Sequence, residues 1–127
     1  MSQHVDLSPT ERAAVAMRAI DDLGDERDDR ALLRLRCGRS HHVGAVFDTA
    51  IGAVFESRVG PHAHGDRDFI DVAHQGGRHG TRFADLLQAG PMTSDIVPAG
   101  CECGTHELSR KEMQKAIAAH RRNIILS

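Results

Sequence analysis

The chain has 127 residues, of which 40% are apolar and only 3% aromatic, with neither Trp nor Tyr. This length and composition predict one folded unit with a modest core of aliphatic side chains. The formal net charge of −2 does not support a strongly basic nucleic-acid-binding protein, because such binding depends on Lys and Arg that neutralise phosphates.

The cysteines and the absence of long apolar runs indicate in which cellular compartment the protein is expected. The three cysteines are an odd number, and a single residue separates Cys101 from Cys103, which suits disulfide geometry poorly. A secreted disulfide framework is therefore not expected. The first seven residues contain no apolar signal core, and no apolar run is long enough to cross a bilayer. We expect a soluble, cytoplasmic protein.

The N-terminal segment predicts a helix and a charged linker. Ser8 fits an N-cap, and Pro9 fits the first helical position. Apolar residues then recur at helical spacing as far as Leu23, and Gly24 suits a C-terminal stop. We expect residues 1–30 to form this helix and a solvated linker, followed by a domain that spans residues 31–127.

The next segment predicts mostly β-structure. Apolar and charged residues alternate over residues 31–37, and the sequence Gly-Ala-Val-Phe occurs at both 44–47 and 52–55, which predicts the two strands of a hairpin. A short apolar run at 69–72 also fits a strand. Residues 81–88 predict a short helix, because one Phe and two Leu would share a helical face.

The C-terminal segment predicts a strand, a helix and a final strand. Residues 95–101 fit a strand. Ser109 and Glu112 have the spacing of a capping box, and the helix that follows would end at a basic cluster over 120–122, which complements a helix C-terminus. A last apolar run covers 124–126. Together these elements predict an α+β fold.

The cysteines and a histidine form the candidate metal ligands. Cys37 is followed closely by His41 and His42, and Cys101 is followed by Cys103. Zinc favours four ligands drawn from Cys thiolates and His imidazoles in a tetrahedron, and two close pairs on separate turns meet that demand. Either histidine could complete the set. We favour His41, because it stays within the turn and leaves His42 to begin the next strand.

Two motifs carry a resemblance to a known group. Cys37-Gly38-Arg39-Ser40-His41 and Cys101-Glu102-Cys103-Gly104, with a hairpin between them and a helix after them, resemble zinc-ribbon proteins of GC-rich actinobacteria and their phages. The resemblance covers roughly residues 31–127. It implies a zinc-ribbon-like antiparallel sheet, with Cys37, His41, Cys101 and Cys103 as ligands. N-terminal and C-terminal helices complete the expected architecture.

Other polar clusters have simpler interpretations. His106 follows Cys103 by three positions and is expected to be an exposed turn residue, although it could also contact a metal ligand or be an alternative ligand itself. A His-x-His-x-Asp pattern at 62–66 is expected to be a surface loop. Basic residues of the C-terminal helix, with arginines at 34, 36 and 39, could form a nucleic-acid patch, but a solvated helix face is preferred because interleaved aromatics are missing.

Four candidate ligands indicate a closed, structural zinc site, since a catalytic zinc keeps one position open. We therefore expect a non-catalytic module that acts through protein–protein interaction with an unidentified partner or with a second copy. A nucleic-acid-binding regulator is the first alternative, and a small zinc enzyme is the second.

Overall fold

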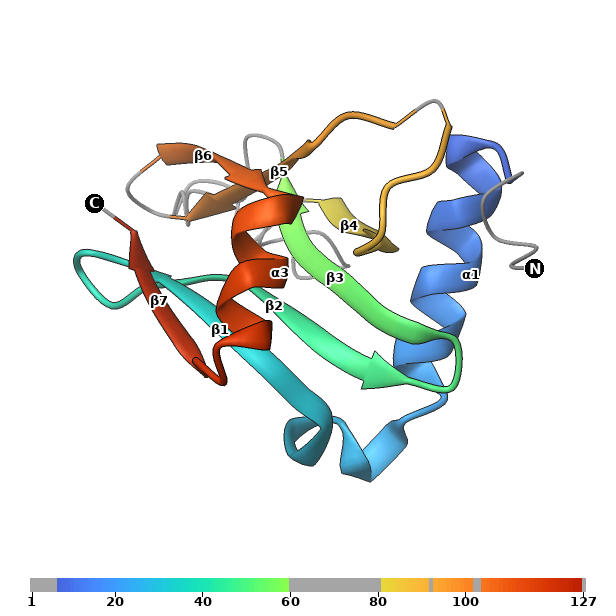
Figure 1. Cartoon of the computed structure of the whole chain (residues 1–127), viewed down its shortest axis with the longest axis horizontal. Coiled ribbons are helices and arrows are strands. Elements are labelled where there is room, and N and C mark those ends of the chain that lie inside the picture. The colour runs from blue at the N-terminus through green and yellow to red at the C-terminus, as the bar shows by residue number, and fades with distance from the viewer. Residues whose placement is uncertain (1–6, 60–80, 92, 102–103, 127) are drawn as a thin grey trace, which may run out of the picture.

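The computed structural model describes residues 7–59, 81–91, 93–101 and 104–126. These residues form an α+β fold with a five-stranded sheet, a separate two-stranded sheet and two α-helices, together with two short 3-10 helices. Figure 1 shows the N-terminal helix at the right of the view and the C-terminal helix near its centre, in front of the larger sheet. The expected α+β class is confirmed.

Helix α1 (Pro9–Asp21) begins as the sequence predicts. The side chain of Ser8 accepts a hydrogen bond from the Glu11 backbone N–H, and the Glu11 carboxylate accepts one from the Ser8 backbone N–H. This reciprocal capping box satisfies two of the donors that a helix start leaves without partners. The charged stretch that follows contains the 3-10 helices η2 (Gly24–Glu26) and η3 (Asp28–Arg30).

The larger sheet has the strand order β4-β3-β2-β1-β7. The predicted hairpin is confirmed, because its two strands pair antiparallel with Gly44 opposite Ser57 and Thr49 opposite Gly52. The strands are β1 (Ala31–Cys37), β2 (His42–Thr49), β3 (Gly52–Val59), β4 (Thr81–Leu86) and β7 (Asn123–Leu126). The expectation for residues 69–72 lies outside the described residues.

The sheet is mixed, so the expectation of a wholly antiparallel sheet is wrong in one pairing. Strand β7 runs parallel to β1, with Leu35 opposite Ile124 and Cys37 opposite Leu126. The reason is the connection: helix α3 (Arg110–Ala118) intervenes between the second sheet and β7, and a parallel neighbour requires such a crossover.

Residues 81–86 form a strand, not the predicted helix. Arg82 and Ala84 pair with Arg58 and Glu56 of β3. In a helix Phe83 and Leu86 would share a face, whereas here Leu86 packs with the α1 side and Phe83 packs with the opposite side. Backbone pairing to β3 therefore outweighs the local helical pattern.

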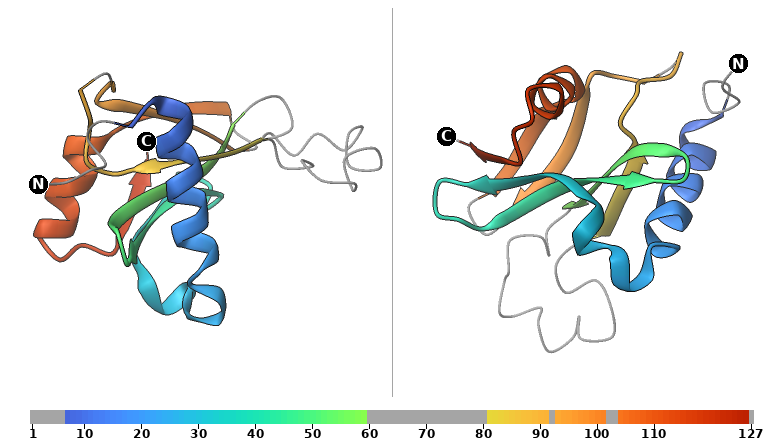
Figure 2. Two further views of the ribbon diagram at one scale, coloured as in Figure 1. Left: turned by 90° about the vertical axis from the view of Figure 1, so that its right-hand side faces the viewer. Right: turned by 60° about the horizontal axis from the view of Figure 1, so that its bottom comes forward.

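Two layers cover the sheet. Ala16 and Ile20 of α1 pack on one face, against a cluster that includes Phe47 and Val54. The other face is covered by α3 and by the antiparallel pair of β5 (Ile96–Cys101) and β6 (Gly104–Ser109). Figure 2 shows α1 apart from α3 and from this pair. Buried β2 residues on both faces are consistent with a sheet enclosed between two layers.

A buried ion network connects the two helices to β4. The Asp85 carboxylate accepts hydrogen bonds from Arg12 Nε of α1 at 2.9 Å and from Arg110 Nη2 of α3 at 2.7 Å. The side chains of both arginines are 5% exposed or less. Arg110 was expected within a basic helix surface, but it faces the interior because Asp85 neutralises it there.

Candidate metal centre

The first turn of the candidate site connects β1 to β2. The Cys37 backbone N–H donates to the His41 carbonyl at 3.0 Å, and the Ser40 N–H donates to the Cys37 carbonyl at 2.8 Å. Ser40 has a φ of 67°, a left-handed conformation that turns the chain back sharply. This turn brings the His41 ring next to the Cys37 side chain, with Nδ1 3.3 Å from Sγ.

A backbone amide also points at the Cys37 sulfur. The Arg39 N–H donates to Cys37 Sγ at 3.4 Å. A hydrogen bond of this kind orients a ligating atom and spreads thiolate charge. The local sequence Cys37-Gly38-Arg39 therefore already supplies part of the outer environment that a metal thiolate requires.

The second turn lies between β5 and β6. Cys101 ends β5, and its antiparallel partner is Gly104 at the start of β6. Gly104 has a φ of +135°, a conformation that side chains rarely permit. Cys103 lies outside the described residues, so the site is described here through Cys37, His41 and Cys101.

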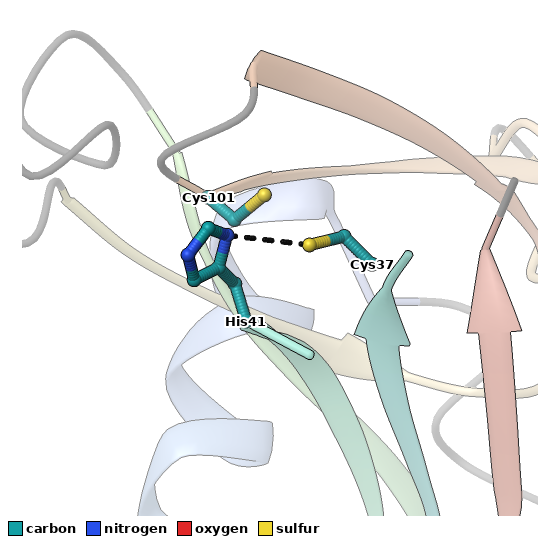
Figure 3. A group of neighbouring side chains, drawn as sticks. All are labelled: Cys37, His41 and Cys101. Atoms are coloured by element: carbon teal, nitrogen blue, oxygen red, sulfur yellow. Dashed lines mark hydrogen bonds between the residues drawn. The ribbon is translucent and has the colours of Figure 1, made fainter. Parts of the chain in front are cut away.

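These three side chains converge, although Cys101 is distant from the other two in sequence. One sulfur or nitrogen atom from each lies within 4.8 Å of the other two, and Figure 3 shows the two sulfurs and the ring nitrogen pointing toward a common region. Zn–S and Zn–N bonds of about 2.3 and 2.0 Å place tetrahedral ligands roughly 3.5–3.8 Å apart. The described group is therefore compact enough to hold a metal ion.

The group is built into the core. Cys37 and Cys101 are 3% and 4% exposed, and both belong to the larger hydrophobic cluster together with Val43 and Ala99. His41 is half-buried. Burial of this kind shields both thiols from most of the solvent.

His41 and His42 occupy different environments. The metal-competent group contains His41, whereas His42 begins β2 opposite Arg36. Partial burial lowers the pKa of His42, and the positive charges of Arg34 and Arg36 lower it further. The structure thus places the favoured histidine beside the two thiols.

His106 is closer to the site than the sequence indicated. It lies on β6 and is half-buried, and its Nε2 is 3.3 Å from Cys101 Sγ. The expectation of an exposed turn residue is therefore wrong. The alternation of β6 brings His106 to the Cys101 side, and it is placed to hydrogen-bond the sulfur from outside the three-residue group.

Two apolar cavities lie away from the candidate metal centre. One of about 360 Å³ is lined by residues that include Leu86, Ile117 and Ala118, and one of about 400 Å³ is lined by Ala14, Ala19 and others. Ile51, in the β2–β3 turn, lines both of them.

No helix among the described residues is long and apolar enough to cross a membrane. The His-x-His-x-Asp pattern at 62–66 lies outside the described residues.

Comparison with known proteins adds no further assignment. No protein-family model, curated protein or solved structure matches the chain. The geometry of the described residues therefore provides the basis for a functional proposal.

Proposed function

We propose that the chain is a zinc-ribbon-like binding module, in which Cys37, His41, Cys101 and Cys103 hold one structural zinc ion. The single observation that carries this proposal is the convergence of Cys37, His41 and Cys101, whose donor atoms lie within 4.8 Å of one another. Thiolates and imidazole are the donors that zinc prefers in closed sites. Cys103 is two residues from Cys101 and supplies the fourth ligand.

The proposed role of the zinc is to stabilise the folded state. The ion joins the β1–β2 turn to the β5–β6 turn, two segments that belong to different sheets. A direct link between the layers is also present, since the Ser57 hydroxyl of β3 donates to the Pro98 carbonyl of β5 at 2.7 Å. With only 3% aromatic residues, the core gains from a metal that couples binding to folding.

The module acts by contact with another protein, and the apolar cavities on either side of Ile51 supply the surface. Along α1 this surface presents small side chains, Ala14 and Ala19, and its lining also includes Arg18 and Asp22. An apolar floor with charged residues beside it suits the apolar face of an amphipathic helix. The proposed partner is therefore a protein that presents such a helix.

Chelation tests the structural role of the zinc. We expect a chelator in the presence of reductant to lower the thermal stability of the wild-type protein strongly, and zinc to restore it. The variant Cys101→Ser should already be destabilised and should respond little to the chelator. Identical melting of the wild type with and without the chelator would overturn the structural role.

A substitution at Ile51 tests the partner surface. Proteins retained by the zinc-loaded wild type are compared with those retained by Ile51→Asp. The matched control is Ile125→Asp, because Ile125 is a 60%-exposed apolar residue on β7, distant in the fold from the Ile51 turn. We expect a partner that is lost with Ile51→Asp and kept with the control. Equal retention by all three proteins would contradict the proposed surface.

A further inference from the structure

Helix α1 covers only part of its face of the larger sheet. Its buried residues contact a cluster that includes Phe47, Val54 and Ala84. On the same face, nearer the Cys37–His41 turn, the strands carry charged side chains instead. Within the described part of the chain, this area is bordered by the η2–η3 segment, from which Arg27 packs over the Phe47 ring at 4.9 Å from its centroid.

Polar side chains form a row across four strands in this area, here called the basic row. Arg36 of β1 is opposite His42 of β2, and Arg58 of β3 is opposite Arg82 of β4. Ser57 bonds to β5 on the other face, so the next residue, Arg58, points to the α1 side. At about 4.8 Å between neighbouring strands, the row spans roughly 14 Å.

Two acidic groups near the row, Glu56 and Asp28, are already engaged by arginines. Glu56 is 8% exposed, and its two carboxylate oxygens accept hydrogen bonds from Arg27 and Arg82. Arg34 pairs with Asp28 at 3.3 Å, but that aspartate is largely exposed. These acids hold Arg27, Arg82 and Arg34 in place, and Arg82 also pairs with Asp21 at 3.0 Å.

Two arginines of the row are available to a ligand. Among the described residues Arg36 and Arg58 form no ion pair, and Arg36 makes only a long hydrogen bond of 3.4 Å to the Ser40 carbonyl. Arg58 also lines a cavity of about 200 Å³ together with Arg27 and His42. The cavity therefore offers guanidinium and imidazole groups at the middle of the row, beside the Glu56 carboxylate that Arg27 and Arg82 already engage.

We propose that the basic row binds the phosphate backbone of a single-stranded nucleic acid. Arg36 and Arg58 contact successive phosphates, and the cavity receives one of them. A face four strands wide does not fit the major groove of a duplex, which admits a helix or a two-stranded ribbon. The contacts are made to phosphates, so binding is independent of base sequence and sensitive to salt.

This surface shares Arg36 with the patch considered from the sequence but excludes the C-terminal helix. The basic C-terminal helix lies on the other face of the sheet, and its Arg110 is buried against Asp85. The inference does not rest on the partner surface around Ile51, and its test uses the zinc-loaded full chain. A negative result for the basic row therefore leaves the proposed partner surface untouched, and the reverse also holds.

Fluorescence anisotropy with a labelled single-stranded oligonucleotide of about 16 nucleotides tests the proposal. We expect Arg36→Glu/Arg58→Glu to lower affinity at least about tenfold and to reduce the slope of log K against log salt by about 1.4. The matched control, Lys111→Glu/Lys115→Glu, has the same charge change on exposed residues of α3 and should bind within about twofold of the wild type.

Several outcomes would overturn the proposal. These are no salt-sensitive binding by the wild type at about 50 mM salt, equal losses in the two double variants, and duplex binding as tight as single-strand binding. Zinc content and circular dichroism verify that each variant is folded. If Arg36→Glu disturbs the adjacent turn, the single variant Arg58→Glu decides the question, and an affinity equal to that of the wild type contradicts the proposal.

Discussion

Replacing Asp85 with asparagine should destabilise the protein more than any exposed charge change. Asp85 accepts hydrogen bonds from two arginines, one in each helix, whose side chains are 2% and 5% exposed. Removing its charge leaves both guanidinium groups buried without a counter-charge, a change that typically costs about 3–5 kcal/mol. Backbone carbonyls still accept from Arg12 and Arg110, so we expect the lower end, about 3 kcal/mol.

Urea and thermal denaturation of Asp85→Asn measure this cost. For a chain of this size, about 3 kcal/mol corresponds to a decrease in Tm of roughly 12 °C. The matched control is Asp21→Asn, since Asp21 pairs with Arg82 but its side chain is 61% exposed, and such surface pairs contribute about 0–1 kcal/mol. If Asp85→Asn cost no more than Asp21→Asn, the network would not connect the helices as described.

Three further predictions concern the sheet and the start of α3. Gly44→Ala places a Cβ 3.0 Å from the Phe55 ring, so urea denaturation should show a loss of about 1–3 kcal/mol. Ser109→Ala removes the N-cap of α3 and should cost about 1 kcal/mol in the same assay. A hydrogen bond from Ser109 lowers the pKa of Asp95 from its ordinary 3.8. The stabilisation from Asp95 is therefore present above that pH and is lost as the pH falls through the lower folded-state pKa. The stability difference between wild type and Asp95→Asn should shrink in that range, and a constant difference would contradict the assignment.

Local patterns predicted the elements whose signals lie within a few residues. The Ser8 cap, the alternation of Leu33 and Leu35 and the repeated Gly-Ala-Val-Phe segments each specify backbone conformation through nearby side chains. The same is true of the first metal turn, in which the spacing of Cys37 and His41 allows both side chains to meet. These features required no knowledge of the tertiary structure.

Features that depend on distant partners were predicted poorly. Residues 81–86 form a strand because β3 offers a pairing edge, which a helical pattern does not reveal. The sequence suggests that Arg110 is a surface residue, but its side chain is buried because it forms an ion pair with Asp85 in the interior. The contact of His106 with Cys101 depends on the pairing of β5 with β6. In each case the deciding partner is remote in sequence or belongs to another strand.

The zinc content of the purified chain, measured in the presence of reductant, tests the structural metal site most directly. We predict one equivalent in the wild type and in His42→Ala, because His42 lies outside the group of converging donors. His41→Ala and Cys37→Ser should each lose most of the metal. Less than about half an equivalent in the wild type, or equal losses in His41→Ala and His42→Ala, would contradict the proposed site.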